Sequence, residues 1–242
     1  MINSLLMWLR ELLPLVMLLS FALAWLQPGL RALLLPVALQ TTLLLLPAWW
    51  FLDPLLSSLD GMGLDWSYCL LYVLGTTALL VAARYSQYRR RALSLSITVL
   101  CCIHLLNLSL FGSGLLHDDS QWQAIATGTA LALGINGSIA VLWYYLLLEV
   151  SVPCRWIWRL VLALLCARQA VMAVTFATQL DVINPGPLLW DTERWLNESS
   201  ELGYLLQALL GYEATPSLAQ LLVFLMASLA VLLWMREGSD ES

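Results

Sequence analysis

Long apolar runs separated by short polar segments make up most of this chain. A helix needs about 20 apolar residues to cross a bilayer, and seven runs reach or approach that length. They cover residues 5–26, 30–52, 66–83, 92–115, 122–148, 156–180 and 217–234. The pattern predicts an all-α polytopic membrane protein with seven transmembrane helices, arranged as a single membrane domain over residues 1–242.

The longest connection, residues 181–215, has a helical periodicity of its own. Its leucines recur on one face of a helix, at Leu202, Leu205, Leu206, Leu209 and Leu210. This spacing predicts an amphipathic helix that lies on the outer surface. Thr215 and Pro216 have the residue types of an N-cap and a first helical turn, so they are expected to begin the last span.

Composition agrees with a membrane protein. Hydrophobic residues account for 61% of the chain, and its mean hydropathy is +0.81. The formal net charge of −5 does not favour nucleic-acid binding. The lipid bilayer is therefore the first partner that we expect.

The arginines indicate an orientation. One side of the seven-span arrangement holds Arg31, Arg84, Arg89, Arg90, Arg91, Arg155, Arg159 and Arg236. The other side has Arg194 and most of the acidic residues. Cytoplasmic loops are enriched in basic residues. We therefore expect the N-terminus outside, the C-terminus in the cytoplasm, and a location in the cytoplasmic (plasma) membrane.

The fifth run contains small residues at four-residue spacing, in the series Ala130, Gly134 and Ser138 and in the pair Gly128 and Ala132. This spacing lets helices approach closely. It predicts that the fifth span lies at the centre of the bundle.

Two adjacent charges, Arg10 and Glu11, lie inside the first run. A charge at the centre of a spanning helix costs about 2.5–3.5 kcal/mol on insertion scales, so these side chains need a polar interior. Pro14 follows three residues after Glu11 and removes the helical partner of the Arg10 carbonyl. Arg168, in the middle of the sixth run, is expected to pair with Glu11.

Several segments resemble the oxidase-dependent high-affinity iron permeases. Residues 187–192 read Pro-Leu-Leu-Trp-Asp-Thr, and residues 201–212 read Glu-Leu-Gly-Tyr-Leu-Leu-Gln-Ala-Leu-Leu-Gly-Tyr, followed by Thr-Pro-Ser at 215–217. Residues 152–159, Val-Pro-Cys-Arg-Trp-Ile-Trp-Arg, are similar to the entry to the family's sixth helix. The resemblance implies three plus three inverted helices and one more.

The same resemblance implies a site. The family carries an Arg-Glu-x-x-Glu motif in helices one and four, whose carboxylates pass ferric iron received from a ferroxidase. Arg10 and Glu11 match the first motif, but Pro14 replaces its second glutamate. In the fourth span, His104 and Asn107 stand where the two glutamates would be. Glu11, His104 and Asn107 are thus the expected metal ligands, supported by Arg10, Pro14 and Arg168.

This ligand set differs from the family's four carboxylates. One carboxylate, an imidazole and an amide oxygen suit a divalent transition metal better than ferric iron. An alternative interpretation is structural: His104 is then a hydrogen-bonded packing residue, Asn107 joins two helices, and Pro14 is an ordinary kink.

Acidic residues in two outer loops form an expected entrance. Asp53, Asp60 and Asp65 lie in one loop, and His117, Asp118 and Asp119 in the other. Carboxylates at an entrance would concentrate cations, although solvated loops have the same composition.

The leading functional hypothesis is an iron permease, or a permease for a related metal ion, that moves the ion into the cytoplasm. Iron would be transported cargo, with no permanently bound cofactor. A ferroxidase or iron-delivery protein outside the cell and a homo- or hetero-oligomer are the expected partners. The alternative is a non-transporting partner or assembly subunit of an iron-uptake complex, favoured by the missing glutamates. An enzyme is not expected, because Cys101, Cys102 and His104 show no nucleophile–base arrangement.

Overall fold

The computed structural model describes residues 2–27, 30–115, 122–152, 154, 156–198 and 200–237. Its helices are α1 (Ile2–Leu26), α2 (Leu30–Trp50), α3 (Leu52–Ser57), η1 (Leu59–Gly61), α4 (Gly63–Arg84), η2 (Ser86–Tyr88), α5 (Arg89–Leu115), α6 (Trp122–Ser151), α7 (Trp156–Gln179), α8 (Glu201–Leu210) and α9 (Leu218–Glu237). Among these residues no strand forms, and an isolated antiparallel bridge joins Leu188 to Ser217. The expected all-helical class is confirmed.

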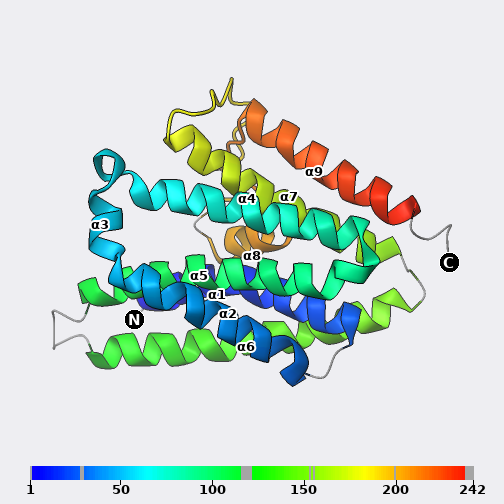
Figure 1. The fold of residues 1–242 in the computed structure, drawn as a ribbon, viewed down its shortest axis with the longest axis horizontal. Coiled ribbons are helices and arrows are strands. Elements are labelled where there is room, and N and C mark those ends of the chain that lie inside the picture. Colours follow the sequence, from blue (N-terminus) through cyan, green and yellow to red (C-terminus); the bar gives the residue numbers. More distant parts are fainter. Residues whose placement is uncertain are drawn as a thin grey trace.

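Six of the described helices are long and apolar enough to cross a membrane. They are Leu5–Leu26, Gly63–Arg84, Ser86–Leu110, Ile125–Ser151, Trp156–Gln179 and Leu218–Met235. The second predicted span forms α2, whose apolar part, Arg31–Pro47, is shorter. Figure 1 shows α2 lying along the same bundle, with successive long helices running in opposite directions. The chain is therefore a helical membrane protein.

The third span begins earlier than the apolar pattern predicts. α4 starts at Gly63 instead of residue 66, directly after the short elements α3 and η1. A side chain at Gly63 would place its Cβ 2.1 Å from the carbonyl oxygen of Leu55. A glycine is thus required where the chain folds back on α3.

The core lies between α1, α4, α5 and α7. Phe21 of α1, Leu79 of α4, Leu100 of α5 and Leu162 of α7 are each at most 1% exposed. Because these four helices share one interior, a polar side chain that one of them turns inward meets the others.

The expectation of a central fifth span is wrong. Gly128 and Ala132 of α6 are buried, and α6 packs mainly on α1. The opposite face is open: Leu142 is 69% exposed, and a Cβ at Gly134 or Gly137 would meet nothing within 4 Å. Small residues permit close approach on a face, but they do not require a neighbour on every face.

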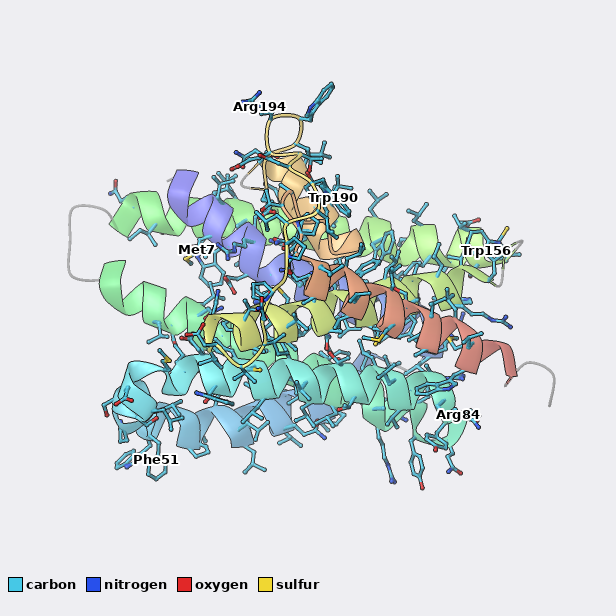
Figure 2. All side chains as sticks on the ribbon, turned by 90° about the horizontal axis from the view of Figure 1, so that it is seen from above. Met7, Phe51, Arg84, Trp156, Trp190 and Arg194 are labelled. Atoms are coloured by element: carbon cyan, nitrogen blue, oxygen red, sulfur yellow. The ribbon has the colours of Figure 1, made fainter. Side chains whose placement is uncertain are left out.

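Arginines join helices at one end of the bundle. The Arg89 guanidinium lies over the Trp25 ring, 4.4 Å from its centroid, and Arg90 donates to the Ala32 carbonyl at 2.5 Å. Figure 2 shows Arg84 and Trp156 at this end and Phe51 at the opposite end. The basic residues that follow α4 and begin α5 thus lie far from the loop between α2 and α4.

The leucine pattern of the long connection does form a helix, α8. The Ser200 side chain caps its start by accepting from the Gly203 backbone N–H at 3.0 Å, and Gly211 ends it with φ of +68°. α8 packs against α1 and α7. Its last turn reaches Arg168, near the middle of α7, where Arg168 Nε donates to the Gln207 carbonyl at 2.9 Å.

The last helix begins two residues later than Thr215 and Pro216 predict. Ser217 precedes α9, and its Oγ accepts from the Gln220 backbone N–H at 3.3 Å. The Gln220 side chain returns the bond by accepting from the Ser217 N–H at 2.8 Å. This reciprocal arrangement is a capping box, which satisfies two backbone donors and so fixes the start of α9.

Candidate functional site

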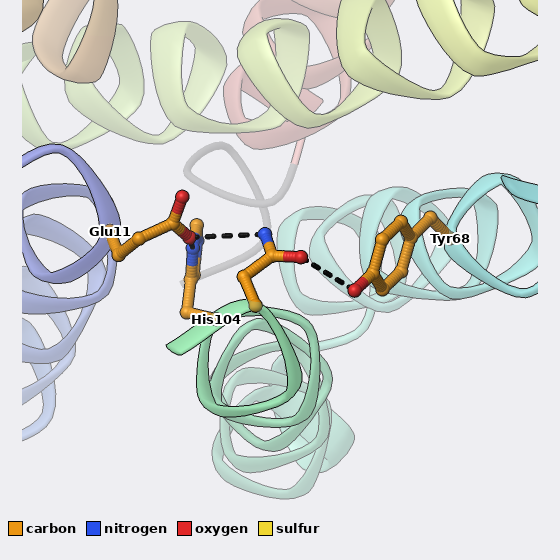
Figure 3. A network of polar contacts seen from close by, with 4 residues as sticks. Glu11, Tyr68 and His104 are labelled. Carbon is orange, nitrogen blue, oxygen red and sulfur yellow. Dashed lines mark hydrogen bonds and ion pairs between the residues drawn. The ribbon is translucent and has the colours of Figure 1, made fainter. Parts of the chain in front are cut away.

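Four side chains from three helices form one hydrogen-bonded network (Figure 3). His104 Nδ1 of α5 lies 2.7 Å from Glu11 Oε2 of α1. Asn107 Nδ2, also of α5, donates to the same Glu11 oxygen at 3.1 Å. The Tyr68 hydroxyl of α4 donates to Asn107 Oδ1 at 2.5 Å. The structure therefore brings Glu11, His104 and Asn107 together and adds Tyr68.

Local sequence explains how these side chains meet. His104 and Asn107 are three residues apart, so they lie on one face of α5. Tyr68 is 5% exposed, and its ring packs edge-on against Phe176 of α7 at a centroid distance of 5.4 Å. Because α7 supports the Tyr68 ring from behind, the hydroxyl is held toward α5.

The network has three hydrogen bonds, two made directly to Glu11 and one made to Asn107. Tyr68 donates to Asn107, and both Asn107 and His104 donate to the Glu11 carboxylate. Charge-assisted bonds of this kind stabilise an ionised carboxylate. The side chains are largely shielded, with His104 at 6% and Glu11 at 13% exposed.

The other ring nitrogen of His104 is available. Nε2 is buried, and within the described part of the chain it has no hydrogen-bond partner. In a neutral imidazole that donates its Nδ1–H to a carboxylate, Nε2 carries a lone pair, which is the arrangement common to metal-binding histidines. Nε2 of His104 is thus the unoccupied nitrogen through which this residue would bind a metal ion.

Few other side chains near this network could bind a metal ion. Among the described residues, no group of three or more His, Cys, Asp or Glu side chains lies close enough to hold a metal ion. A cation at this place would use Glu11 and His104 together with neutral oxygens. Asn107 Oδ1 already accepts from Tyr68, so this amide must exchange a hydrogen bond before it can coordinate.

The three supporting residues have different positions. Arg10 is exposed, whereas Pro14 is buried in α1. Arg168 is 8% exposed and donates to the Gln207 carbonyl. In the described part of the chain no ion pair joins it to Glu11, so the expected pairing is not formed. The carbonyls at the end of α8 have a partial negative charge and replace Glu11 as its partner.

The expected entrance is described only in part. Asp60 is exposed in η1, and Asp65 is half-buried in the first turn of α4. Asp53 lies in α3, and its side chain is outside the described part. His117, Asp118 and Asp119 lie outside the described residues.

Sequence reasoning missed Tyr68 and a second polar contact. Gln169 of α7, 2% exposed, donates to Ser96 Oγ of α5 at 3.1 Å. A Cβ at Gly75 of α4 would lie 2.4 Å from Gln169 Oε1, so a larger residue there would displace the end of the Gln169 side chain. A glutamine inside an apolar run was a usable signal for Gln169. Tyr68 gave none, because its partner lies 39 residues away.

Comparison of the chain with protein-family models, with curated proteins and with solved structures found no match. The interpretation of the site therefore rests on its own geometry: a largely buried carboxylate that binds an imidazole and an amide, with a phenol bonded to the amide, between three helices of a membrane protein.

Proposed function

We propose that this protein is a permease that moves a metal cation across the cytoplasmic membrane, with iron as the first candidate from the sequence resemblance. One observation carries the proposal: Glu11 of α1 and His104 of α5 form a buried ionisable pair within two apolar helices. Ionisable groups inside membrane helices are costly and commonly mark ion pathways. Glu11, His104 and Asn107 are the proposed ligands.

The proposed topology has seven spans, because α2 is added to the six helices of membrane-spanning length. Three helices are followed by three inverted helices and then by α9. Helix neighbours support it. α1 lies beside α6 and α2 lies beside α5, while α4 packs on α7. These pairs are expected if α1, α2 and α4 are related to α5, α6 and α7 by a two-fold axis in the membrane plane. Such an axis passes between α1 and α5, where Glu11 meets His104.

The proposed orientation places the arginine-rich end in the cytoplasm and the acidic loops outside. The ion then enters past Asp60 and Asp65, and an iron-delivery protein docks there. The class of the transported ion follows from the atoms that would bind it. Histidine nitrogen favours a divalent transition metal, whereas ferric iron favours oxygen ligands.

Uptake into proteoliposomes that contain only this protein tests the proposal. Ferrous and ferric iron are supplied separately, and Glu11→Gln is compared with wild type at equal protein content. Glu149→Gln is the matched control, because Glu149 is an exposed carboxylate on α6, outside the network. We expect uptake that Glu11→Gln abolishes and Glu149→Gln leaves unchanged. Equal uptake by Glu11→Gln and wild type would contradict the proposed role.

A second candidate function has its own support. Glu11 Oε2 already accepts from both His104 and Asn107, a closed arrangement that also suits a structural joint between helices. In that case the chain is a non-transporting partner or assembly subunit. Neither wild-type protein nor the Glu11→Gln variant would then take up either iron species. The variant would, however, have a lower thermal stability than wild type.

A further inference from the structure

A cavity of about 280 Å³ lies away from the Glu11 network, between α7, α9 and the segment that joins them. Its lining includes three aromatic rings, one carboxylate, one amide and one glycine: Trp190, Tyr212, Phe224, Glu213, Gln220 and Gly211. Figure 2 shows Trp190 on the segment that projects from the side of the bundle beside α8 and α9. The cavity is therefore mainly apolar and aromatic, with one acidic group.

Backbone hydrogen bonds fix the aromatic side of the cavity. The Leu189 N–H donates to the Pro216 carbonyl at 3.0 Å, and the Thr192 N–H donates to the Ala214 carbonyl at 2.9 Å. These bonds hold Trp190 against the residues that precede α9. These two hydrogen bonds join residues 189–192 to residues 214–216 and so fix the position of Trp190 relative to the start of α9.

The Tyr212 hydroxyl is engaged elsewhere. It lies 2.7 Å from Thr192 Oγ1 and donates to the Leu196 carbonyl at 2.9 Å. The ring of Tyr212, and not its hydroxyl, is what this residue contributes to the cavity. Gly211, with φ of +68°, lets the backbone pass under Phe224, since a Cβ there would lie 3.3 Å from Phe224 Cε2.

The acidic group has a fixed position. Gln220 Nε2 donates to Glu213 Oε2 at 2.8 Å and also contacts Thr175 Oγ1 at 3.0 Å. Burial, together with the nearby Glu198 carboxylate, raises the pKa of Glu213 to about 7. In the described part of the chain no ion pair neutralises Glu213. The guanidinium of Arg168 is directed to the Gln207 carbonyl instead.

We infer that this cavity binds a small apolar ammonium ion, in particular a quaternary ammonium group. Aromatic ring faces attract such a cation, and Glu213 supplies the opposite charge. An anion would meet the Glu213 carboxylate that lines the cavity, and a neutral apolar ligand would gain nothing from its charge. A metal ion would find one carboxylate among rings that offer it no donor atoms. The inference does not depend on the proposed iron transport.

The test uses the full chain purified in maltoside detergent, which contains no ammonium group. Binding of choline is measured by calorimetry and compared with 3,3-dimethylbutan-1-ol, its neutral analogue of the same shape. We expect choline to bind at least about tenfold more tightly, because only the cation interacts with rings and carboxylate. Equal binding of the two probes, or no binding of choline, would overturn the inference.

Variants locate the site. Glu213→Gln keeps the size and a hydrogen-bonding oxygen but removes the charge, and Trp190→Leu removes one ring; each should weaken choline binding by about tenfold. Glu149→Gln, outside the cavity, should not. Trp190 is 46% exposed, so Trp190→Leu remains informative if Glu213→Gln fails to fold. Unchanged affinity in a folded Trp190→Leu variant would contradict the assigned site.

Two further arms distinguish the sources of the ligand and the role of the charge. If a lipid headgroup is the natural occupant, nanodiscs of phosphatidylcholine should weaken free choline binding relative to phosphatidylglycerol. If a free amine is the occupant, both nanodiscs should give the same affinity.

Since the ionised carboxylate binds the cation, affinity should rise from pH 6 to pH 8. The groups that act on Glu213 are Glu198 and Gln220, and a pH-independent affinity would contradict its role.

Discussion

The Nε of Arg168, near the middle of α7, donates to the carbonyl oxygen of Gln207 in the last turn of α8 at 2.9 Å. The Gln207 carbonyl also accepts from the Gly211 backbone N–H at 3.1 Å, and the carbonyls at the C-terminal end of a helix form the negative end of its dipole. Arg168 is 8% exposed, so its charge is stabilised by this helix end. The contact ties α8 to the bundle.

Replacing Arg168 with methionine should therefore loosen α8. Methionine keeps much of the apolar stem but removes a charged donor, a loss of about 1.5–3 kcal/mol for a hydrogen bond to a charged group. We expect a lower unfolding temperature in detergent and faster amide exchange in α8. Arg91→Met is the control, because Arg91 is exposed. Identical exchange in both variants would show that Arg168 does not hold α8.

Tyr68→Phe should weaken the Glu11 network without opening the core. The ring and its packing on Phe176 stay, but Asn107 Oδ1 loses its donor, which costs about 1 kcal/mol. We expect cation uptake to fall and thermal stability to decrease slightly. Tyr72→Phe is the matched control, since Tyr72 is 3% exposed and also stacks on Phe176 but lies outside the network. An equal effect of both changes on uptake would argue against a specific role for Tyr68.

Gly75→Ala should destabilise the junction of α4, α5 and α7. The added methyl group would lie 2.4 Å from Gln169 Oε1, and overpacking of this kind costs about 1–3 kcal/mol. The same change at Gly134 meets nothing within 4 Å and should be neutral or stabilising, because alanine favours helix. Unfolding temperatures of the two variants check this. A stable Gly75→Ala protein would mean that Gln169 can move away from Ser96.

Protein stability should decrease between pH 5 and pH 8 through Glu213. The pKa of its carboxyl is raised from 4.5 to about 7 by burial and by Glu198, so the folded state binds more protons than the unfolded state in this range. Stability then falls as pH rises above 4.5 and levels off above about 7. In Glu213→Gln this contribution is absent. Unfolding temperatures measured across the range should show a smaller decline in the variant, and parallel curves would contradict the assignment.

The sequence by itself determined the elements and much of the site. Apolar runs of bilayer length predicted the long helices, since no other backbone arrangement satisfies its hydrogen bonds in lipid without closing a barrel. The leucine spacing at 202–210 predicted α8. The charge at Glu11, costly in an apolar helix, indicated an interior partner, and three-residue spacing placed His104 and Asn107 on one helix face.

Only the tertiary structure decided which faces meet. Small residues at Gly134 and Ser138 carry no information on the presence of a neighbour, and α6 leaves them open at the edge of the bundle. Arg168 had an acidic candidate partner in Glu11, yet the end of α8 reached it instead. Tyr68 entered the site through packing on Phe176, from a helix far along the chain. Periodicity is a property of one helix, whereas the contacts between helices depend on the rotation and the neighbours that packing selects.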